Sequence, residues 1–117
     1  MDEKQDRQFT KKGEPMSNFK SLLSKEEATT QGSRFLVLRN RIRLRIIELL
    51  SRHGGRICVV EIAEVLNEHP ATISGHLAVL RAVRLVTREQ YGIFAYYTLN
   101  KEGLDKYREF LDQITAL

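Results

Sequence analysis

The hydrophobic pattern of this 117-residue chain changes period near Leu85, and this change limits the folds open to it. Before Leu85, apolar side chains recur at the spacing of amphipathic helices, as they do in residues 59–66. After it, residues 85–90 and 94–99 have the composition of two strands joined around Tyr91 and Gly92. The sequence therefore predicts a mostly α-helical protein with a small β-hairpin.

Two short helices with a tight link between them precede this hairpin. Asn67 suits the left-handed position that closes the first helix. Pro70 fits the first turn of the second helix, where its missing N–H would be unpaired in any case, and His69 is the expected cap. Helix, short link, helix and hairpin follow one another in this order in a winged helix-turn-helix. Such a module places its second helix in the major groove of DNA.

The second helix has one apolar side and one side of small and polar residues. Ile73, Leu77 and Leu80 follow the apolar side and are expected to be buried. Small residues permit a close approach to base edges, and hydroxyl groups can donate or accept hydrogen bonds there. The residues of this helix and of the hairpin that we expect to contact DNA are Ala71, Thr72, Ser74, Gly75, His76, Ala78, Arg81, Arg88 and Gln90.

Gly75 stands in the interior of this helix, where glycine costs about 1 kcal/mol relative to alanine. A close approach to Gly75, by DNA or by a packed backbone, would explain this residue. The other interpretation is a surface glycine that the helix tolerates.

The basic charge of the chain is concentrated after residue 32. Acidic and basic residues balance in residues 1–32, so the net charge of +4 belongs to residues 33–117. Such a surface favours a polyanionic partner. Four arginines around the start of the helix that Asn40 caps are either phosphate contacts, which would position the protein without reading sequence, or solvated surface. They are Arg39, Arg41, Arg43 and Arg45.

The flanking segments complete the expected domain organisation. Residues 1–16 are polar, lack apolar periodicity and are expected to form a disordered arm. Ser17 is the expected cap of an extra N-terminal helix over residues 17–32, and Ser33 begins a further short helical piece. Residues 33–117 would form the DNA-binding and dimerisation domain.

A final helix, which Asn100 is expected to cap, carries an apolar stripe at the end of the chain. A small monomer has little surface with which to bury such a stripe, so we expect a homodimer, with packing inside the monomer as the alternative. The expected interface residues are Phe35, Leu104, Tyr107, Phe110, Leu111 and Ile114.

Residues 34–103 resemble the ArsR/SmtB family of bacterial repressors. The resemblance is carried by residues 43–46 (RLRI), 58–63 (CVVEIA), 71–80 (ATISGHLAVL) and 85–86 (LV), and by Gly92 with residues 96–99 (YYTL). It implies a winged helix-turn-helix that forms a homodimer through its first and last helices. It also implies that this dimer binds a twofold-symmetric operator and blocks transcription until an inducer weakens binding.

The chain departs from the family at the metal-binding cysteines. Family sensors of arsenic or heavy metals commonly carry Cys-Val-Cys before the recognition helix, where this chain reads Cys58, Val59 and Val60. A soft metal needs several thiolates, and Cys58 is the only cysteine. The family's zinc sites use histidine on the last helix, and residues 105–117 contain none. We therefore expect no metal and no cofactor.

Cys58 has two remaining interpretations. It falls near a helix N-terminus with Arg56 close in sequence, a setting that favours the thiolate and its oxidation, which makes it a candidate redox switch. It is otherwise a small buried apolar residue.

No motif points to catalysis. The three histidines lack the HExxH spacing, and no serine or cysteine lies in a nucleophile motif, so we expect no enzyme. The chain has neither the apolar run of about 20 residues that spans a membrane nor a signal peptide, and we expect a cytoplasmic protein without a membrane partner.

The favoured function is a sequence-specific, double-stranded DNA-binding transcriptional regulator, a repressor that binds a palindromic operator as a homodimer. The alternative is a winged-helix protein-interaction adaptor without sequence-specific DNA binding. The sequence identifies no inducer.

Overall fold

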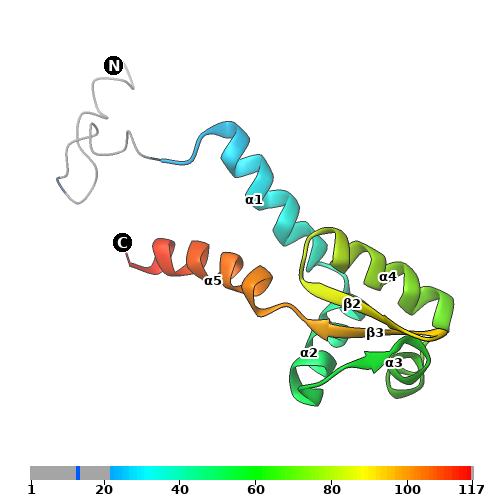
Figure 1. The fold of residues 1–117 in the computed structure, drawn as a ribbon. Helices are drawn as coiled ribbons and strands as arrows, with labels where there is room; N and C mark the ends of the chain where they lie inside the picture. The colour runs from blue at the N-terminus through cyan, green and yellow to red at the C-terminus, as the bar shows by residue number, and fades with distance from the viewer. Residues whose placement is uncertain (1–12, 14–21, 117) are drawn as a thin grey trace. The chain divides into compact units, whose positions relative to one another are not determined.

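The computed structural model describes Gly13 and residues 22–116. The chain divides into two units, Met1–Gln31 and Gly32–Leu117. Of the predicted N-terminal arm, all but Gly13 lies outside the described residues, as does Ser17. The elements in chain order are α1 (Lys25–Val37), α2 (Arg41–His53), β1 (Ile57–Cys58), α3 (Val59–Leu66), α4 (Pro70–Ala82), β2 (Val86–Tyr91), β3 (Phe94–Leu99) and α5 (Lys101–Thr115) (Figure 1).

Helix α1 differs from the prediction for this part of the chain. The sequence predicted a helix that ends by residue 32 and a separate helical piece from Ser33, whereas the structure has one helix through both. Two threonines near the predicted end of the first helix lie inside α1. Their hydroxyls donate to carbonyls one turn back, Thr29 to Lys25 at 2.8 Å and Thr30 to Glu26 at 3.0 Å.

Ser24 caps α1. Its Oγ accepts from the Glu27 N–H at 3.1 Å, and the Glu27 carboxylate accepts from the Ser24 N–H at 2.9 Å. These two bonds form a capping box, which satisfies N–H groups that the first turn of a helix leaves without a partner. The signal is a serine followed three residues later by glutamate, and we did not identify it from the sequence.

The predicted caps at Asn40, Asn67 and His69 are confirmed. The Asn40 side chain accepts from the first turn of α2, and Gly54 closes that helix at φ +71°. Asn67 closes α3 at φ +53°. His69 Nδ1 accepts from the Ala71 N–H at 3.0 Å, and Pro70 begins α4. Local capping thus produces the tight link that holds α3 and α4 next to each other.

One core joins α2, α3 and α4 to the sheet and to the start of α5. Burying each large aliphatic side chain contributes about 1.5–3 kcal/mol to folding. The fully or nearly fully buried residues are Ile46, Leu50, Ile57, Ile62, Ala63, Leu66, Ile73, Leu77, Leu80, Leu85, Val86, Tyr97 and Tyr107.

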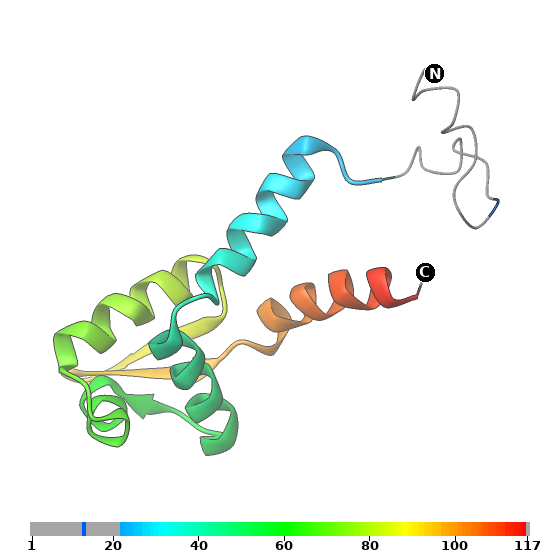
Figure 2. The same ribbon diagram turned by 180° about the vertical axis from the view of Figure 1, so that it is seen from behind.

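The sheet has three antiparallel strands in the order β1-β3-β2. Seen from both sides, β2 runs beside α4 (Figure 2). The predicted hairpin is confirmed, but its turn is one residue later: Tyr91 pairs with Phe94, so the turn residues are Gly92 and Ile93. Gly92 has φ +60°, which glycine adopts without steric cost. Tyr91 instead stays in the strand, where its ring packs against Tyr96.

The segment just after α4 contacts the start of α5 through three residues, Arg84, Asn100 and Gly103. Arg84 has φ +61°, a left-handed conformation that costs a non-glycine residue roughly 1–2 kcal/mol. The Asn100 amide donates to the Arg84 carbonyl at 2.8 Å, so its side chain is not the helix cap that the sequence predicted. A Cβ at Gly103 would collide with that same carbonyl group. The close approach of α5 to Arg84 therefore requires glycine at position 103.

We expect Gly103→Ala to lower the free energy of unfolding by about 2–3 kcal/mol, because the added methyl group forces α5 away from the Arg84 carbonyl. Urea unfolding followed by circular dichroism measures this change. Gly75→Ala is the control, since a Cβ there meets nothing within 4 Å. Equal stability of Gly103→Ala and the unchanged protein would show that α5 does not depend on this contact.

Candidate nucleic-acid interface

Helix α4 presents one fully exposed face opposite its buried one. Ile73, Leu77 and Leu80 are each 0% exposed, which fixes the rotation of the helix about its axis. The residues on the solvent side are then set by the helical repeat. Those that the structure exposes are Ala71, Thr72, Ser74, Gly75, Ala78 and Arg81. The sequence-predicted residues of this helix therefore share one open face, apart from His76.

Gly75 is not explained by a packed backbone. A Cβ built at this position meets no heavy atom within 4 Å, and the residue is exposed. Two explanations remain for its place in the helix interior, namely a close approach by DNA and a tolerated surface glycine.

His76 faces α2 at the edge of the core. Its Nδ1 accepts a hydrogen bond from Arg43 Nε at 3.1 Å, and the residue is half-buried. Burial, assisted by the positive charge of Arg43, lowers the pKa of His76 below its ordinary value. With Nδ1 as the acceptor, the neutral ring carries its proton on Nε2, which is the atom that could donate to a phosphate.

The four arginines predicted as phosphate contacts do not have equal surroundings. Arg43 also donates to the Val37 carbonyl at 3.3 Å, and Arg45 donates to the Leu66 carbonyl at 3.3 Å. Both guanidinium groups thus help to hold α2 against neighbouring segments. Arg39, Arg41 and Arg43 also line one open hollow of about 500 Å³, so the structure brings three of the four together.

The wing is the hairpin of β2 and β3. Arg88 and Gln90 are exposed on one face of β2, and Arg88 donates to the Gln90 side chain at 2.6 Å. The Gln90 amide in turn donates to the Gly92 carbonyl at 3.1 Å. These bonds hold both predicted side chains along the strand near the turn.

Arg56 braces the other face of the wing. Its guanidinium lies 4.0 Å from the centre of the Tyr91 ring and 5.4 Å from that of Tyr96. Such cation–π contacts contribute about 0.5–1 kcal/mol at exposed sites. Sequence reasoning did not place Arg56 here, because the contact joins the residue before β1 to rings on β2 and β3, which the pairing of the strands brings together.

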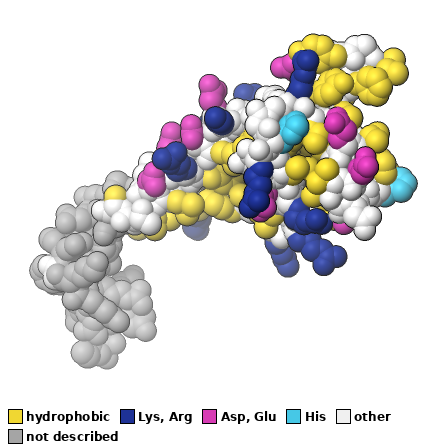
Figure 3. Space-filling model, turned by 90° about the horizontal axis from the view of Figure 1, so that it is seen from below, with side chains coloured by type: hydrophobic (Ala, Val, Ile, Leu, Met, Phe, Trp, Pro, Cys, Tyr) yellow, Lys and Arg dark blue, Asp and Glu magenta, His cyan; other side chains and the backbone are white. Residues whose placement is uncertain are grey.

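Apolar side chains are exposed at the tip of the wing. Ile93 is 88% exposed, and Tyr91 and Phe94 are each about half exposed. A space-filling view shows apolar groups lying open among Lys and Arg side chains on one face of the molecule (Figure 3). The tip therefore offers no positive charge to DNA from its two turn residues.

Cys58 is bonded to a carboxylate. Its Sγ donates to Glu61 Oε1 at 2.9 Å, and its backbone N–H donates to the same oxygen at 3.2 Å. The hydrogen bond from the thiol is the main cause that lowers the pKa of Glu61. The Arg56 guanidinium, which is close to Cys58 in sequence, lies over the Tyr91 ring. The redox-switch interpretation of Cys58 stays a prediction.

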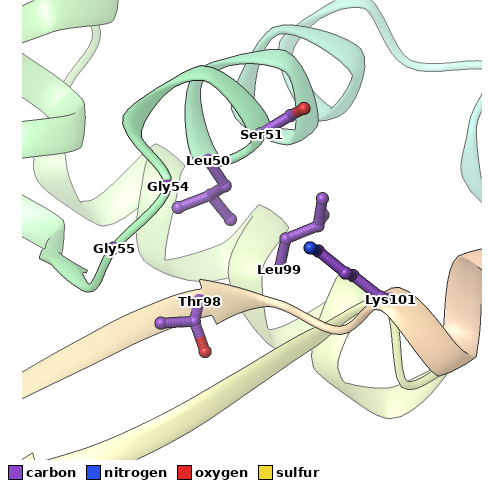
Figure 4. Close-up of a pocket in the computed structure, with 7 residues that line it drawn as sticks. All are labelled: Leu50, Ser51, Gly54, Gly55, Thr98, Leu99 and Lys101. Atoms are coloured by element: carbon purple, nitrogen blue, oxygen red, sulfur yellow. The ribbon is translucent and has the colours of Figure 1, made fainter.

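Within the part of the chain that the structure describes, no three His, Cys, Asp or Glu side chains come together as a metal site. A hollow of about 160 Å³ lies between α2, β3 and α5, with Leu50 and Leu99 beside Ser51 and Lys101 (Figure 4). Pockets for drug-sized ligands are about 300–1,000 Å³, so this hollow is too small for one.

The expected dimer residues separate into two groups. Tyr107 is only 6% exposed, its hydroxyl donates to the Arg34 carbonyl at 2.8 Å, and Phe35 packs edge-on against its ring at 5.0 Å. Phe110 lies 5.7 Å from Phe35, between ring centres. Tyr107 thus packs within the protomer, and its place at a dimer interface stays a prediction.

The other group stays open to solvent at the end of α5. Leu111 is 49% exposed and Ile114 is 51% exposed, while Leu104 packs against the core. The apolar residues at the start of α5 therefore pack inside the protomer, and those towards its end remain exposed.

Comparison with known proteins identifies the family. Residues 40–88 match the model of the bacterial regulatory proteins of the arsR family. The chain is also 36% identical over 73 residues to the arsenical resistance operon repressor of Bacillus subtilis (strain 168), a match that covers 62% of this chain and 68% of that protein. The chain belongs to the arsR family. The recognised resemblance is confirmed.

Solved structures of regulators from this family have the same fold. One is a possible transcriptional regulator for arsenical resistance, 32% identical, with a TM-score of 0.62 over 69% of this chain and 82% of that one. Another is the homodimeric winged helix-turn-helix DNA-binding domain of a possible ArsR-family regulator from Mycobacterium bovis, 26% identical, with a TM-score of 0.60 over 80% and 88% of the two chains. The predicted fold class, mostly α with a winged helix-turn-helix, is confirmed. Among the residues described, no helix is long and apolar enough to cross a membrane.

The lowered pKa of His76 predicts a pH-dependent stability. Between the folded pKa and the ordinary value of about 6.5, the unfolded chain binds more protons at His76 than the folded chain does. The free energy of unfolding should therefore fall as the pH drops below about 6.5 and through the folded pKa. Urea midpoints measured from pH 7.5 to pH 5 follow this loss.

His76→Asn is the matched variant, because its amide oxygen can replace Nδ1 as the acceptor for Arg43 without titrating. We expect a flatter pH dependence in this variant. An unchanged slope would show that the pH dependence does not come from His76.

Proposed function

We propose that this arsR-family chain is a transcriptional repressor that binds double-stranded DNA in a sequence-specific manner through α4. The observation that carries the proposal is the exposed face of α4, whose small residues Ala71, Gly75 and Ala78 let the helix approach base edges. Thr72 and Ser74 are exposed on this face and supply hydroxyl donors and acceptors. The B. subtilis relative, an operon repressor, supports the same function.

Phosphate contacts would position the protein on the duplex. The open hollow lined by Arg39, Arg41 and Arg43 is the proposed place for one phosphate, and Arg81, Arg88 and Gln90 are exposed on α4 and the wing. Contacts of this kind fix register and make binding depend steeply on salt. Arg45 donates to the Leu66 carbonyl, and a phosphate contact would be its second role.

The proposed repressor acts as a homodimer, as the M. bovis domain does. Leu111 and Ile114 at the end of α5 are exposed apolar residues that a second copy would cover, and the partly buried Phe35, Leu104 and Phe110 would complete the interface. Two α4 helices of such a dimer would enter successive major grooves about 34 Å apart, so the operator would be palindromic. Residues 33–117 would form this DNA-binding and dimerisation domain.

The inducer of this repressor would not be an arsenical, although the names of two relatives refer to arsenical resistance. A soft metalloid needs several thiolates, and this chain has Cys58 alone, with its thiol bonded to Glu61. The proposed protein performs no catalysis and works in the cytoplasm, where bacterial DNA is found.

Selection from a random DNA library should return a motif with two half-sites in inverted repeat, and affinity should fall steeply as salt rises. The double variant Thr72→Ala/Ser74→Ala should stay folded and lose about thirtyfold or more in discrimination against wrong bases, since each of the two base contacts contributes about 1–3 kcal/mol. Fluorescence anisotropy on matched and scrambled duplexes measures the salt dependence of affinity and the discrimination against wrong bases.

Ser51→Ala is the matched control, because Ser51 is an exposed hydroxyl residue on α2, outside the predicted interface. It should leave discrimination unchanged. Failure of the library to enrich any motif would instead favour the protein-interaction adaptor, for which α4 need not read bases.

Gly75→Ala should affect stability and DNA binding in opposite directions. Alanine in the helix interior should raise the free energy of unfolding by up to about 1 kcal/mol, since the added Cβ meets nothing in the protein. The same Cβ enters the space proposed for the DNA bases, so operator affinity should fall. A more stable variant with unchanged affinity would identify Gly75 as a tolerated surface glycine.

A further inference from the structure

A second basic hollow lies at the other end of α4, against α5. Its volume is about 290 Å³, and it is formed within the unit Gly32–Leu117. Three positively charged residues from three different segments line it, and its lining contains no carboxylate group. The lining residues are Arg34, Ala82, Val83, Arg84, Gly103, Lys106 and Tyr107.

The backbone around this hollow is held by specific contacts. Arg84 keeps its left-handed conformation because its carbonyl accepts from Asn100 and faces Gly103 without a Cβ between them. The Arg34 carbonyl accepts from the buried Tyr107 hydroxyl at 2.8 Å. Two of the three cationic residues are therefore anchored through their main chains, so their positions at the hollow are fixed by the fold.

The charges at this place are unbalanced. Burial raises the pKa of Tyr107, and the positive charge of Arg34 opposes part of that rise, so this charge acts on a residue that lines the hollow. Like charges that line one concave site raise the local concentration of counter-ions. Guanidinium and ammonium groups form their strongest hydrogen bonds with carboxylates and phosphates. An anion bound here would relieve the repulsion among the three cations.

The hollow is separate from the proposed base-reading residues at the start of α4, although Arg81, a proposed phosphate contact, is the neighbour of Ala82. It includes Ala82, the last residue of α4, whereas Ala71 and Thr72 lie in the first turn. A helix rises about 1.5 Å per residue, so these ends of the 13-residue helix are about 15 Å apart. A phosphate of the DNA held by the N-terminal part of α4 would not fill this hollow.

We propose that this hollow binds a small polyanion, with its charge on phosphate or carboxylate groups, and that this ligand is the effector of the repressor. The regulatory half of the proposal rests on the proposed function. The ligand would contact the end of α1, the end of the recognition helix α4 and the start of α5 together. Because it joins the DNA-reading helix to the two helices at the expected dimer interface, its binding would change operator affinity, and DNA would change ligand affinity by the same factor.

The binding half is tested with inorganic pyrophosphate and citrate on the full chain, at constant ionic strength set by sodium chloride. We expect saturable binding by isothermal titration calorimetry and a rise in melting temperature. Arg84→Asn and Lys106→Gln remove charge at exposed positions, and asparagine tolerates the left-handed backbone at position 84. Each should weaken binding about tenfold or more, the effect of losing one charge-assisted hydrogen bond.

Lys101→Gln is the matched control, since it removes the same charge from α5 but lines the smaller hollow beside α2. It should bind both probes as the unchanged protein does. Equal weakening by Lys101→Gln and Lys106→Gln would overturn the proposal, because the probes would then sense only the net charge. Absence of saturable binding by both probes would overturn it as well.

The regulatory half is tested by measuring operator affinity with and without a saturating probe. We expect the affinity to change in the unchanged protein and not in the Arg84→Asn/Lys106→Gln double variant. An identical loss of affinity in both proteins would show simple competition at the DNA face and would overturn the effector role. If calorimetry shows the expected anion binding but no operator can be selected, the anion site is supported and the proposed repressor function is contradicted.

Discussion

The contact between the Arg84 carbonyl and the start of α5 is the constraint on which the arrangement of this protein depends. It occurs where the recognition helix has just ended and the wing is about to begin, and it brings Gly103 against the main chain of Arg84. Asn100 uses its amide to bind that carbonyl, and its backbone N–H donates to Leu85 at 2.9 Å. The recognition helix, the wing and the last helix are thereby joined at one point, and an error there would displace all three.

Local chemistry explains why much of the fold could be predicted. Capping at Asn40, Asn67 and His69 depends on residues within a few positions, and so does the change from helical to strand spacing near Leu85. The predictions that were wrong concern choices that tertiary contacts make. Asn100 has the composition of a cap, but the nearby Arg84 carbonyl takes its side chain, and α1 continues through residues that would end an isolated helix.

The exposed face of α4 was also predictable from local spacing, whereas the tertiary contacts around it were not. Helical spacing alone distinguishes the buried Ile73, Leu77 and Leu80 from the open side of α4, so the exposed residues follow without knowledge of the rest of the chain. Sequence could not reveal that Arg43 binds His76, 33 positions away, or that Tyr107 binds the Arg34 carbonyl, 73 positions away. Contacts of this kind decide whether a charged or aromatic residue is free for a partner.

These long-range contacts also divide the basic residues by role. Arg43 bonds His76 while it also lines the proposed phosphate hollow, and Arg56 lies over tyrosine rings, so both help to hold α4 and the wing in place. Arg34, Arg84 and Lys106 line a hollow at the far end of α4. One helix thus has small residues that can approach bases near its start and concentrated positive charge at its end. If a ligand bound at that charge displaced the end of α4, the helix would carry the displacement towards the face proposed to read bases.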